Sequence, residues 1–258
     1  MVRVLIWNEF YHEQKKASVR ELYPDGMHGC IRDFLRLNGD LEIKTATQYD
    51  GNFNRDDINA GLTEELLDNT DVLIWWGHCH HKSVPDVWVD KIVSRVNEGM
   101  GFIALHSSHY SKVFKALMGT SCDLRWRLGD EHERLWNLSP NHPVMKGIPE
   151  YFELDGEETY GERFNIPKPQ ELLMVGWYAG GDVFRSVCTF TRGVGRILYI
   201  QPGHETYPTL KNPYIQRIIT NGVYWAAPNV KVELGAVHAA VSPEELRKNG
   251  ETPTERVR

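Results

Sequence analysis

The first half of the chain alternates short apolar runs with stripes of apolar residues at helical spacing. Strand-length apolar runs, of the kind found in strands covered on both faces, are Val2–Trp7, Asp71–Trp76 and Met100–Leu105, with a shorter alternating run at Leu41–Thr45. Apolar positions at i, i+3 and i+4 predict helices over Met27–Asn38, Thr63–Asp68, Pro85 to just before Gly99, and Val113–Met118. This repeated alternation predicts an α/β fold with a flavodoxin-like, doubly wound and mostly parallel sheet.

The second half of the chain changes character. Residues 121–166 are irregular and rich in charges and aromatic rings, which predicts an insertion of loops, with room for antiparallel strands, that shapes a pocket. Strands return at Leu172–Tyr178, Phe184–Thr191 and Arg196–Gln201, and Gly180-Gly181 between the first two is a hairpin signal, so the sheet gains antiparallel edge strands. A helix over Pro213–Ala226 closes one domain of residues 1–227, and residues 228–258 form a polar C-terminal extension.

Composition narrows the class of protein. The 258 residues are 41% hydrophobic and carry a formal net charge of -6, so the chain can bury a core but has no basic excess for nucleic acid. No apolar run approaches the roughly 20 residues that cross a bilayer, and the N-terminus does not resemble a signal peptide. The four cysteines form no CxxC pair. We therefore expect a cytoplasmic protein with reduced thiols, no membrane or nucleic-acid partner and no nucleotide cofactor.

The candidate chemistry follows the predicted strands directly. Ligands of open parallel sheets bind outside the carboxyl ends of the strands, so these positions are the ones to inspect. They hold Asn8, Glu9 and His12; His78, Cys79, His80 and His81; His106, Ser107, Ser108 and His109; and His204 with Glu205. Seven of the eleven histidines thus gather at one edge of the sheet, which packing alone does not explain.

His106 occupies the turn where a strand passes into a helix. A helix N-terminus lowers the pKa of an imidazole, so a neutral His106 is expected there, suited to binding metal or moving protons. Ser107 and Ser108 are expected to be helix caps. His204-Glu205 lies in an ordered loop, where one of the two side chains should face the pocket. A divalent metal such as zinc is one alternative, with His28, His78 and His106 as candidate ligands, although no HExxH spacing fixes the set.

The insertion supplies carboxylates and aromatic rings. In the acidic run 153–162 we expect only Glu158 and Tyr160 to reach the site, and the rest to be a solvated loop. Flat rings beside polar side chains are typical of sugar sites, although most rings of a chain like this belong to the core. The rings and guanidinium groups expected to contact a ligand are Trp76, Trp126, Arg127, Trp136 and Arg185.

A set of motifs in fixed order resembles the ThuA-like (trehalose utilisation) family. The matching stretches include WNEFYHE (7–13), LIWWGHCHH (73–81), GMGFIALHSSHYSKVFKALMGTSC (99–122), ETYGERFNIPKP (158–169) and GRILYIQPGHETYP (195–208), and the resemblance extends to about residue 227. It implies the fold of class I glutamine amidotransferases and the handling of a sugar, a disaccharide or an oxidised glycoside. In that superfamily the strand-to-helix turn carries a catalytic cysteine, whereas here it carries His106, so the resemblance does not imply amidotransferase activity. His204-Glu205 resembles the remaining His and Glu of that triad.

Two main functions follow from these residues. The first is a sugar-processing lyase, hydrolase or isomerase with His106, His204, Glu205 and Glu158 as catalytic groups. Its predicted substrate-binding residues are Asn8, Glu9, His12, Trp76, His109, Trp126, Arg127, Tyr160 and Arg185. The alternative is a non-catalytic sugar-binding or regulatory protein on an amidotransferase-like fold. A metal-dependent hydrolase with another substrate is a third alternative, and the apolar late strands are compatible with a homo-oligomer.

Overall fold

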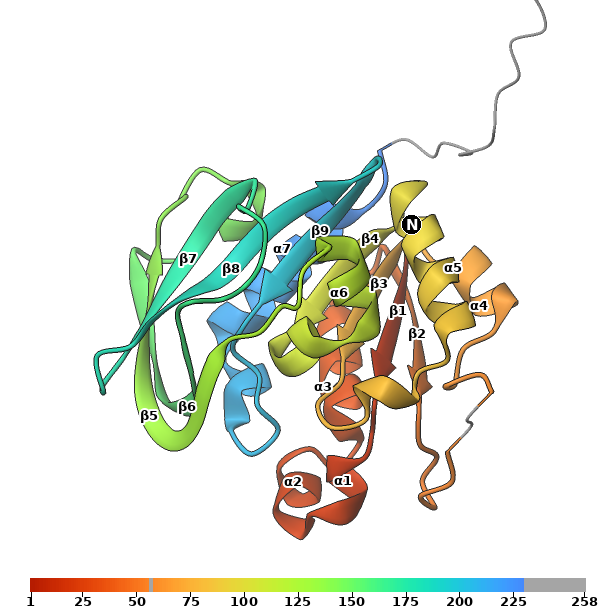
Figure 1. Cartoon of the computed structure of the whole chain (residues 1–258), viewed down its shortest axis with the longest axis horizontal. Helices are drawn as coiled ribbons and strands as arrows, with labels where there is room; N and C mark the ends of the chain where they lie inside the picture. The colour runs from red at the N-terminus through yellow and green to blue at the C-terminus, as the bar shows by residue number, and fades with distance from the viewer. Residues whose placement is uncertain (56–57, 230–258) are drawn as a thin grey trace, which may run out of the picture.

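One nine-stranded sheet crosses the molecule, and half of it is parallel. The computed structural model describes residues 1–55 and 58–229. Strands follow the order β2-β1-β3-β4-β9-β8-β7-β5-β6, and those from β2 to β9 are parallel (Figure 1). These five are β1 (Val2–Asn8), β2 (Leu41–Thr47), β3 (Val72–Trp76), β4 (Gly101–Leu105) and β9 (Gly195–Ile200). The predicted flavodoxin-like order is confirmed, with β9 as its fifth strand.

Helices cover both faces of the parallel half, as a doubly wound sheet requires. On one face, apolar side chains of α3 (Gly26–Leu35) and α7 (Pro213–Ala226) join those of the strands in one core. On the other, α4 (Glu64–Asp68), α5 (Asp86–Asn97) and α6 (Lys112–Met118) form a second core. Every residue of β3 and β4 is buried, which explains why these strands are continuous apolar runs.

Short helices beyond the carboxyl end of β1 frame the site. They are α1 (His12–Lys15) and α2 (Ala17–Leu22), and Figure 1 shows them projecting below the end of that strand. Three single-turn 3-10 helices, η1 (His81–Ser83), η2 (His106–Tyr110) and η4 (Pro208–Lys211), follow β3, β4 and β9. A fourth, η3 (Pro143–Met145), lies between two strands of the antiparallel half. The segments that carry the candidate histidines therefore meet at one edge of the sheet.

The antiparallel half of the sheet is larger than the sequence suggests. It consists of β8 (Val183–Arg192), β7 (Glu171–Tyr178), β5 (Arg125–Asn137) and β6 (Tyr151–Gly161). The prediction of a solvated loop over 153–162 is wrong, because these residues belong mainly to β6. Register shifts interrupt the pairing of β5 with β6, and the first six residues of β5 are all exposed, so its alternation of polar and apolar residues is weak.

Two predictions concern the ends of the chain and the membrane. The predicted extension 228–258 falls almost entirely outside the described residues, which stop at 229. Within the described part of the chain, none of the helices combines the length and the apolar character that a bilayer crossing requires.

Candidate functional site

The loop after β3 is held from behind by one carboxylate. Glu9, which directly follows β1, is fully buried and accepts backbone N–H groups from three successive residues of this loop. Its Oε2 lies 2.9 Å from the amide nitrogen of His78 and 2.8 Å from that of His80, and its Oε1 lies 3.0 Å from that of Cys79. Both oxygens of Glu9 are therefore engaged with backbone, and the carboxylate fixes the direction in which His78 points.

His106 is buried and paired with Glu158. Its backbone lies in the left-handed region (φ 51°), an uncommon conformation for a side-chain-bearing residue, at the point where β4 ends. Nδ1 of His106 donates to the carbonyl oxygen of Gln201 at 2.9 Å, and Nε2 lies 3.0 Å from Oε2 of Glu158. Tyr160 stacks on the ring, with centroids 5.0 Å apart. The side chain is completely enclosed, so it reaches a ligand only through Glu158.

The pKa of His106 shifts in the direction opposite to the one expected from a helix dipole. Burial alone would lower the pKa of His106, but the hydrogen bond to Glu158 and the charges of Glu158 and Glu157 outweigh burial and raise it. Burial likewise would raise the pKa of Glu158, and the contact with His106 lowers it instead. The expectation of a lowered pKa for His106 is wrong because the carboxylate partner comes from β6, about fifty residues further along the chain.

Ser107 and Ser108 join neighbouring strand ends rather than capping a helix. The Oγ of Ser107 donates to the carbonyl oxygen of Gly77 at 2.8 Å, and the Oγ of Ser108 donates to that of Trp75 at 2.8 Å. The N-cap of α6 is Ser111, whose side chain accepts the amide of Phe114. The prediction of two caps is therefore wrong, and these hydroxyls hold the loop of His78 against the turn of His106.

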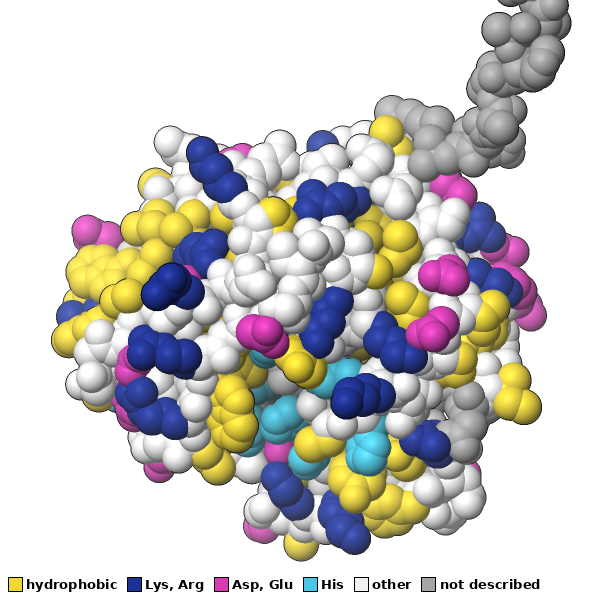
Figure 2. Space-filling view, viewed as in Figure 1, with side chains coloured by type: hydrophobic (Ala, Val, Ile, Leu, Met, Phe, Trp, Pro, Cys, Tyr) yellow, Lys and Arg dark blue, Asp and Glu magenta, His cyan; other side chains and the backbone are white. Residues whose placement is uncertain are grey.

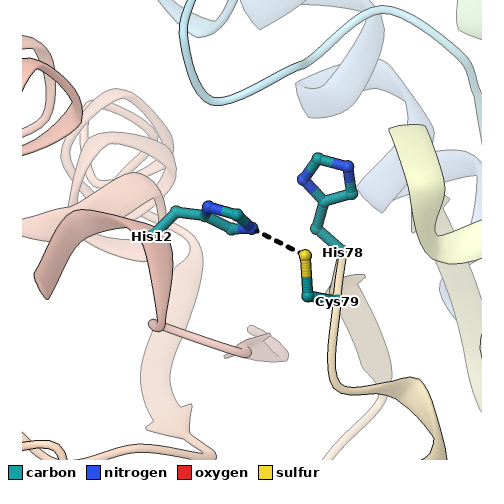
Figure 3. A group of neighbouring side chains, drawn as sticks. All are labelled: His12, His78 and Cys79. Atoms are coloured by element: carbon teal, nitrogen blue, oxygen red, sulfur yellow. Dashed lines mark hydrogen bonds between the residues drawn. The ribbon is translucent and has the colours of Figure 1, made fainter. Parts of the chain in front are cut away.

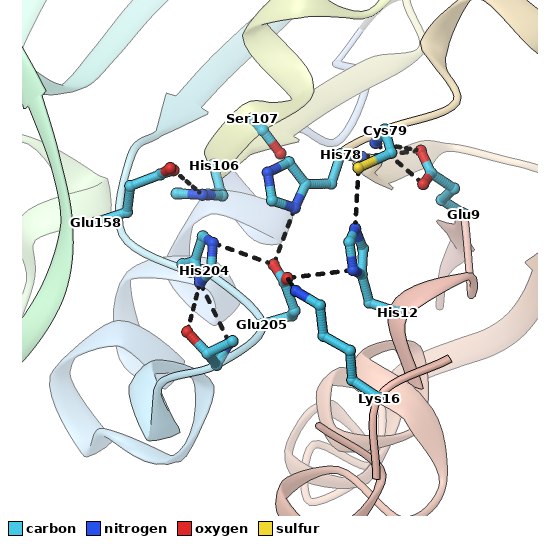
Figure 4. Close-up of polar contacts among 12 residues, drawn as sticks. Glu9, His12, Lys16, His78, Cys79, His106, Ser107, Glu158, His204 and Glu205 are labelled. Carbon is cyan, nitrogen blue, oxygen red and sulfur yellow. Dashed lines mark hydrogen bonds and ion pairs between the residues drawn. The ribbon is translucent and has the colours of Figure 1, made fainter. Parts of the chain in front are cut away.

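Glu205 lies at the centre of a group of basic side chains (Figure 4). Its Oε2 is 2.9 Å from Nδ1 of His78, and its Oε1 is 3.0 Å from Nζ of Lys16 and 3.3 Å from Nδ1 of His12. Burial alone would raise the pKa of Glu205, but the hydrogen bond from His78 and the surrounding histidines outweigh it and keep the carboxyl ionised. Glu205 thus orients His78 by its Nδ1, and Nε2 of His78 points toward Glu158 and His204 (Figure 4).

The loop of His204 is fixed by a second buried glutamate. Glu157 accepts the backbone N–H of Gly203 at 3.0 Å and that of His204 at 3.2 Å. The indole of Trp76 donates to the carbonyl oxygen of Gly203 at 3.0 Å. Nδ1 of His204 is 2.8 Å from the hydroxyl of Thr206, and burial lowers the pKa of His204 to about 3. His204 is accordingly neutral at physiological pH, with Nε2 directed toward Glu205 and His78.

A pocket opens beside these groups. It has a volume of about 450 Å³, and Figure 2 shows histidine side chains gathered in a hollow of one face of the molecule. Its wall consists of His78, Cys79, His81, Ser107, His109, Tyr110, Asp123, Leu124, Trp126, Glu158 and Tyr160. Burial lowers the pKa of His81 and that of His109 to about 3, so both are neutral hydrogen-bonding groups. The ring of Trp126 is 66% exposed at the mouth.

The structure distributes the sequence-predicted residues over three environments. On the pocket wall lie His78, His109, Trp126, Glu158 and Tyr160. In contact with these from behind lie Glu9, His12, Trp76, His106, His204 and Glu205. Outside the wall lie Asn8, His28, Arg127, Trp136 and Arg185. Arg127 pairs with Glu131 and Asp182, and Arg185 pairs with Glu162, so both guanidinium groups are engaged by carboxylates of the antiparallel half.

Two groups of side chains within the described residues could hold a metal ion. Each places three ligand atoms within 4.8 Å of one another: one is His12, His78 and Cys79 (Figure 3), and the other is His78, Glu158 and His204. The predicted set of His28, His78 and His106 is not assembled. Nδ1 of His28 contacts Asn8 at 2.9 Å, and both nitrogens of His106 are engaged as described above.

Sequence reasoning missed several residues that build the site. Lys16 and Thr206 contact Glu205 and His204, but both are polar residues of short surface segments without a distinguishing pattern. Glu157 was assigned to a solvated loop together with its neighbours. The sequence holds a signal for the strand only: Phe152, Leu154, Glu158 and Tyr160 lie at even spacings, the period of a strand, and Glu157 is out of phase with them.

The structure is an α/β protein with the fold of glutamine amidotransferases, and His106 occupies the turn directly after β4. A glutamine amidotransferase from Thermotoga maritima shares the fold with a TM-score of 0.52 and 11% identity, over 87% of this chain and 97% of that one. A family model described as trehalose utilisation matches residues 3–226, and the chain belongs to this ThuA family.

Other solved structures agree with this assignment. A ThuA-like protein from Parabacteroides merdae has a TM-score of 0.68 at 15% identity, covering 91% of this chain and 92% of its own. A cytoplasmic protein from Salmonella typhimurium has a TM-score of 0.57 at 12% identity, covering 88% of this chain and 100% of its own. No curated protein matches the sequence. At these identities the likeness extends to the fold.

Proposed function

We propose that this protein is a cytoplasmic enzyme that processes a small carbohydrate by moving protons on it in the pocket beside β6. The observation that carries the proposal is the arrangement of His78 and Glu158. Both face the pocket, and each contacts a titratable side chain on the side away from the pocket. Glu205 contacts His78, and His106 contacts Glu158. Such pairs set the protonation state of a group before substrate arrives, which is how acid–base catalysts are prepared.

The two pocket-facing groups have different roles in this proposal. His78 is the base, because its Nδ1–H is committed to Glu205 and Nε2 is left with its lone pair. Glu158 is the second proton-exchanging group, and the contact with His106, whose pKa it raises, favours the ionised carboxylate. His106 and Glu205 are positioning residues, since neither belongs to the pocket wall. Proton transfer by His78 and Glu158 is compatible with a lyase, a hydratase, an isomerase or a hydrolase.

The substrate class rests on the family and on the wall of the pocket. The matching family is described as trehalose utilisation. The wall offers neutral imidazoles at His81 and His109, the hydroxyl groups of Tyr110 and Tyr160, and the exposed ring of Trp126. Hydrogen-bonding groups that fix hydroxyls, beside an aromatic platform for the C–H face of a ring, suit a neutral sugar. The cytoplasmic location is supported by structural neighbours described as cytoplasmic proteins.

Turnover of a sugar panel tests the proposal. Disaccharides and their oxidised glycoside derivatives are incubated with the protein, and products are followed by chromatography and by solvent deuterium incorporation. Glu158→Gln keeps the shape of the side chain and removes its proton exchange, so we expect turnover to fall by about 10²–10⁴-fold. Glu153→Gln is the matched control, because Glu153 lies on the same strand but is paired with Arg134 outside the pocket. Binding of a sugar with no turnover by the parent protein would refute the enzyme and favour the sugar-binding alternative.

A further inference from the structure

We infer that His78, His204 and Glu158 form a binding site for one divalent cation of the zinc type at the floor of the pocket. Their ligand atoms all lie within 4.8 Å of one another and come from three separate segments, after β3, after β9 and within β6. Four-coordinate zinc with bonds of about 2.0–2.2 Å holds its ligands about 3.4 Å apart, a spacing that small side-chain rotations reach from this arrangement. Two imidazoles and one carboxylate are a common ligand set for catalytic zinc.

The atoms that do not face the ion are already fixed. Nδ1 of His78 is bound to Glu205, and the carboxylate–histidine pair directs Nε2 inward (Figure 4). Nδ1 of His204 contacts the hydroxyl of Thr206 at 2.8 Å, so a proton on Nδ1 leaves Nε2 as a ligand. Oε2 of Glu158 lies on His106, which leaves its second oxygen for a cation. Metal-binding histidines and carboxylates characteristically have such outer partners, which set the tautomer and the orientation of the ligand.

The neighbouring group of His12, His78 and Cys79 is less suited to an ion. Figure 3 shows that Nδ1 of His78 faces His12 and Cys79, and this nitrogen is the one bound to Glu205. Nε2 of His12 is itself 3.2 Å from the sulfur of Cys79, so two of the three groups bind each other. An ion in this position would have to break both contacts, whereas an ion between His78, His204 and Glu158 leaves both in place and displaces the longer 3.5 Å contact between Nε2 of His204 and Oε2 of Glu205.

The site has room for a substrate. His78 and Glu158 belong to the pocket wall, so three protein ligands leave a coordination position open toward the pocket of about 450 Å³. The inference rests on the proposed function for the use of this pocket and changes two of its roles: an Nε2 that binds the ion has no lone pair left for a proton, so with the ion bound His78 and Glu158 would serve as ligands. The ion would take water or a sugar oxygen as its fourth ligand and would lower the pKa of that oxygen.

Metal analysis of the full-length protein tests the inference. The protein is stripped with a chelator, dialysed against Zn²⁺, Mn²⁺ or Co²⁺, and analysed by elemental analysis and by calorimetric titration. We expect about one equivalent of ion in the parent protein. Glu205→Gln removes an outer partner and should weaken binding by about 10–100-fold, and Glu158→Gln, which removes a ligand, should weaken it further. Cys79→Ser is the control and should bind as the parent does. Circular dichroism verifies that each variant is folded.

Each result has a defined meaning. Absence of stoichiometric metal from the parent at micromolar free ion overturns the site, and so does loss of binding in Cys79→Ser with binding retained in Glu158→Gln. Sugar turnover by the chelated protein at the full rate also overturns the inference, while the proposed function survives. Stoichiometric metal that depends on Glu158, with no turnover of any sugar, supports the metal site and counts against the proposed carbohydrate activity. The two proposals can therefore fail separately.

Discussion

The loop that carries His78 depends on the charge of Glu9, and Glu9→Gln tests how strongly. The carboxylate is fully buried and accepts three backbone N–H groups, from His78, Cys79 and His80. Glutamine has the same shape, but only one of its two terminal atoms accepts a hydrogen bond. With its oxygen in the place of Oε2 it retains the contacts with His78 and His80 and the 3.1 Å contact with the N–H of Cys79, while its amide group points a donor at that same N–H.

The cost of this change follows from three contributions. Charge-assisted hydrogen bonds are roughly twice as strong as neutral ones, so the two retained bonds each weaken by about 1 kcal/mol. The N–H of Cys79 keeps only its longer hydrogen bond and meets a second donor, which adds about 1–2 kcal/mol. Burying a neutral amide in place of a carboxylate recovers part of a desolvation cost of several kcal/mol, which we take as about 1 kcal/mol. The expected loss in the free energy of unfolding is therefore about 2–3 kcal/mol.

Urea denaturation at pH 7 and amide hydrogen exchange measure the effect. For a domain of this size the loss corresponds to a fall in Tm of about 5–10 °C. The amides of residues 78–80 should exchange faster in Glu9→Gln than in the parent, while those of β4 change only with global stability. Glu21→Gln, at an exposed position of α2, is the control. A Glu9→Gln variant whose unfolding free energy lies within about 0.5 kcal/mol of the parent would show that charge at this position does not hold the loop.

Two further predictions concern acid stability and substrate affinity. Burial lowers the pKa of His81 and of His109 from 6.5 to about 3, so the unfolded chain binds protons below pH 6.5 that the folded protein does not. Stability should therefore be fully present above pH 6.5 and fall by about 1.4 kcal/mol per pH unit for each histidine on acidification toward pH 3, and urea titrations of the metal-free protein should show a shallower slope for His109→Asn. Trp126→Ala removes an exposed ring at the pocket mouth. It should raise KM for a sugar by about 5–30-fold, with kcat nearly unchanged, and an unchanged KM would exclude the ring from substrate binding.

The parallel half of the fold could be predicted because its strands are buried on both faces. β3 and β4 are apolar at every position, and the helix stripes between the strands have clear stops, such as the left-handed Gly119 after α6. The long pair of β5 and β6 could not be predicted in the same way. Arg125 to Asp130 are all exposed, and the bulges on either side of Glu131 shift the phase of the pattern, so no period of two persists along β5.

The same reasoning explains which parts of the site were accessible from the sequence. The rule that strand ends meet at one edge correctly gathered His78, His106, His204 and Glu205, because it depends only on the parallel half. The rule could not predict the pKa values of these side chains, because the pKa values depend on contacts with residues far away in the sequence. The turn of His106 by itself predicts a lowered pKa, whereas the contact with Glu158 on β6 raises the pKa of His106.

The antiparallel half is accordingly part of the site. β6 brings three side chains to the carboxyl ends of the parallel strands. Glu157 accepts the backbone N–H of His204, Glu158 pairs with His106, and Tyr160 stacks on the ring of His106. Glu158 and Tyr160 lie over the turn after β4, so His106 does not belong to the pocket wall. His106 at this turn therefore orients Glu158 and lowers the pKa of its carboxyl group, and Glu158 is the side chain that faces the pocket. In the proposed enzyme the proton-exchanging group is therefore Glu158 on β6 and not the residue at the turn, and a variant at Glu158 should affect a ligand directly where one at His106 acts only through that carboxylate.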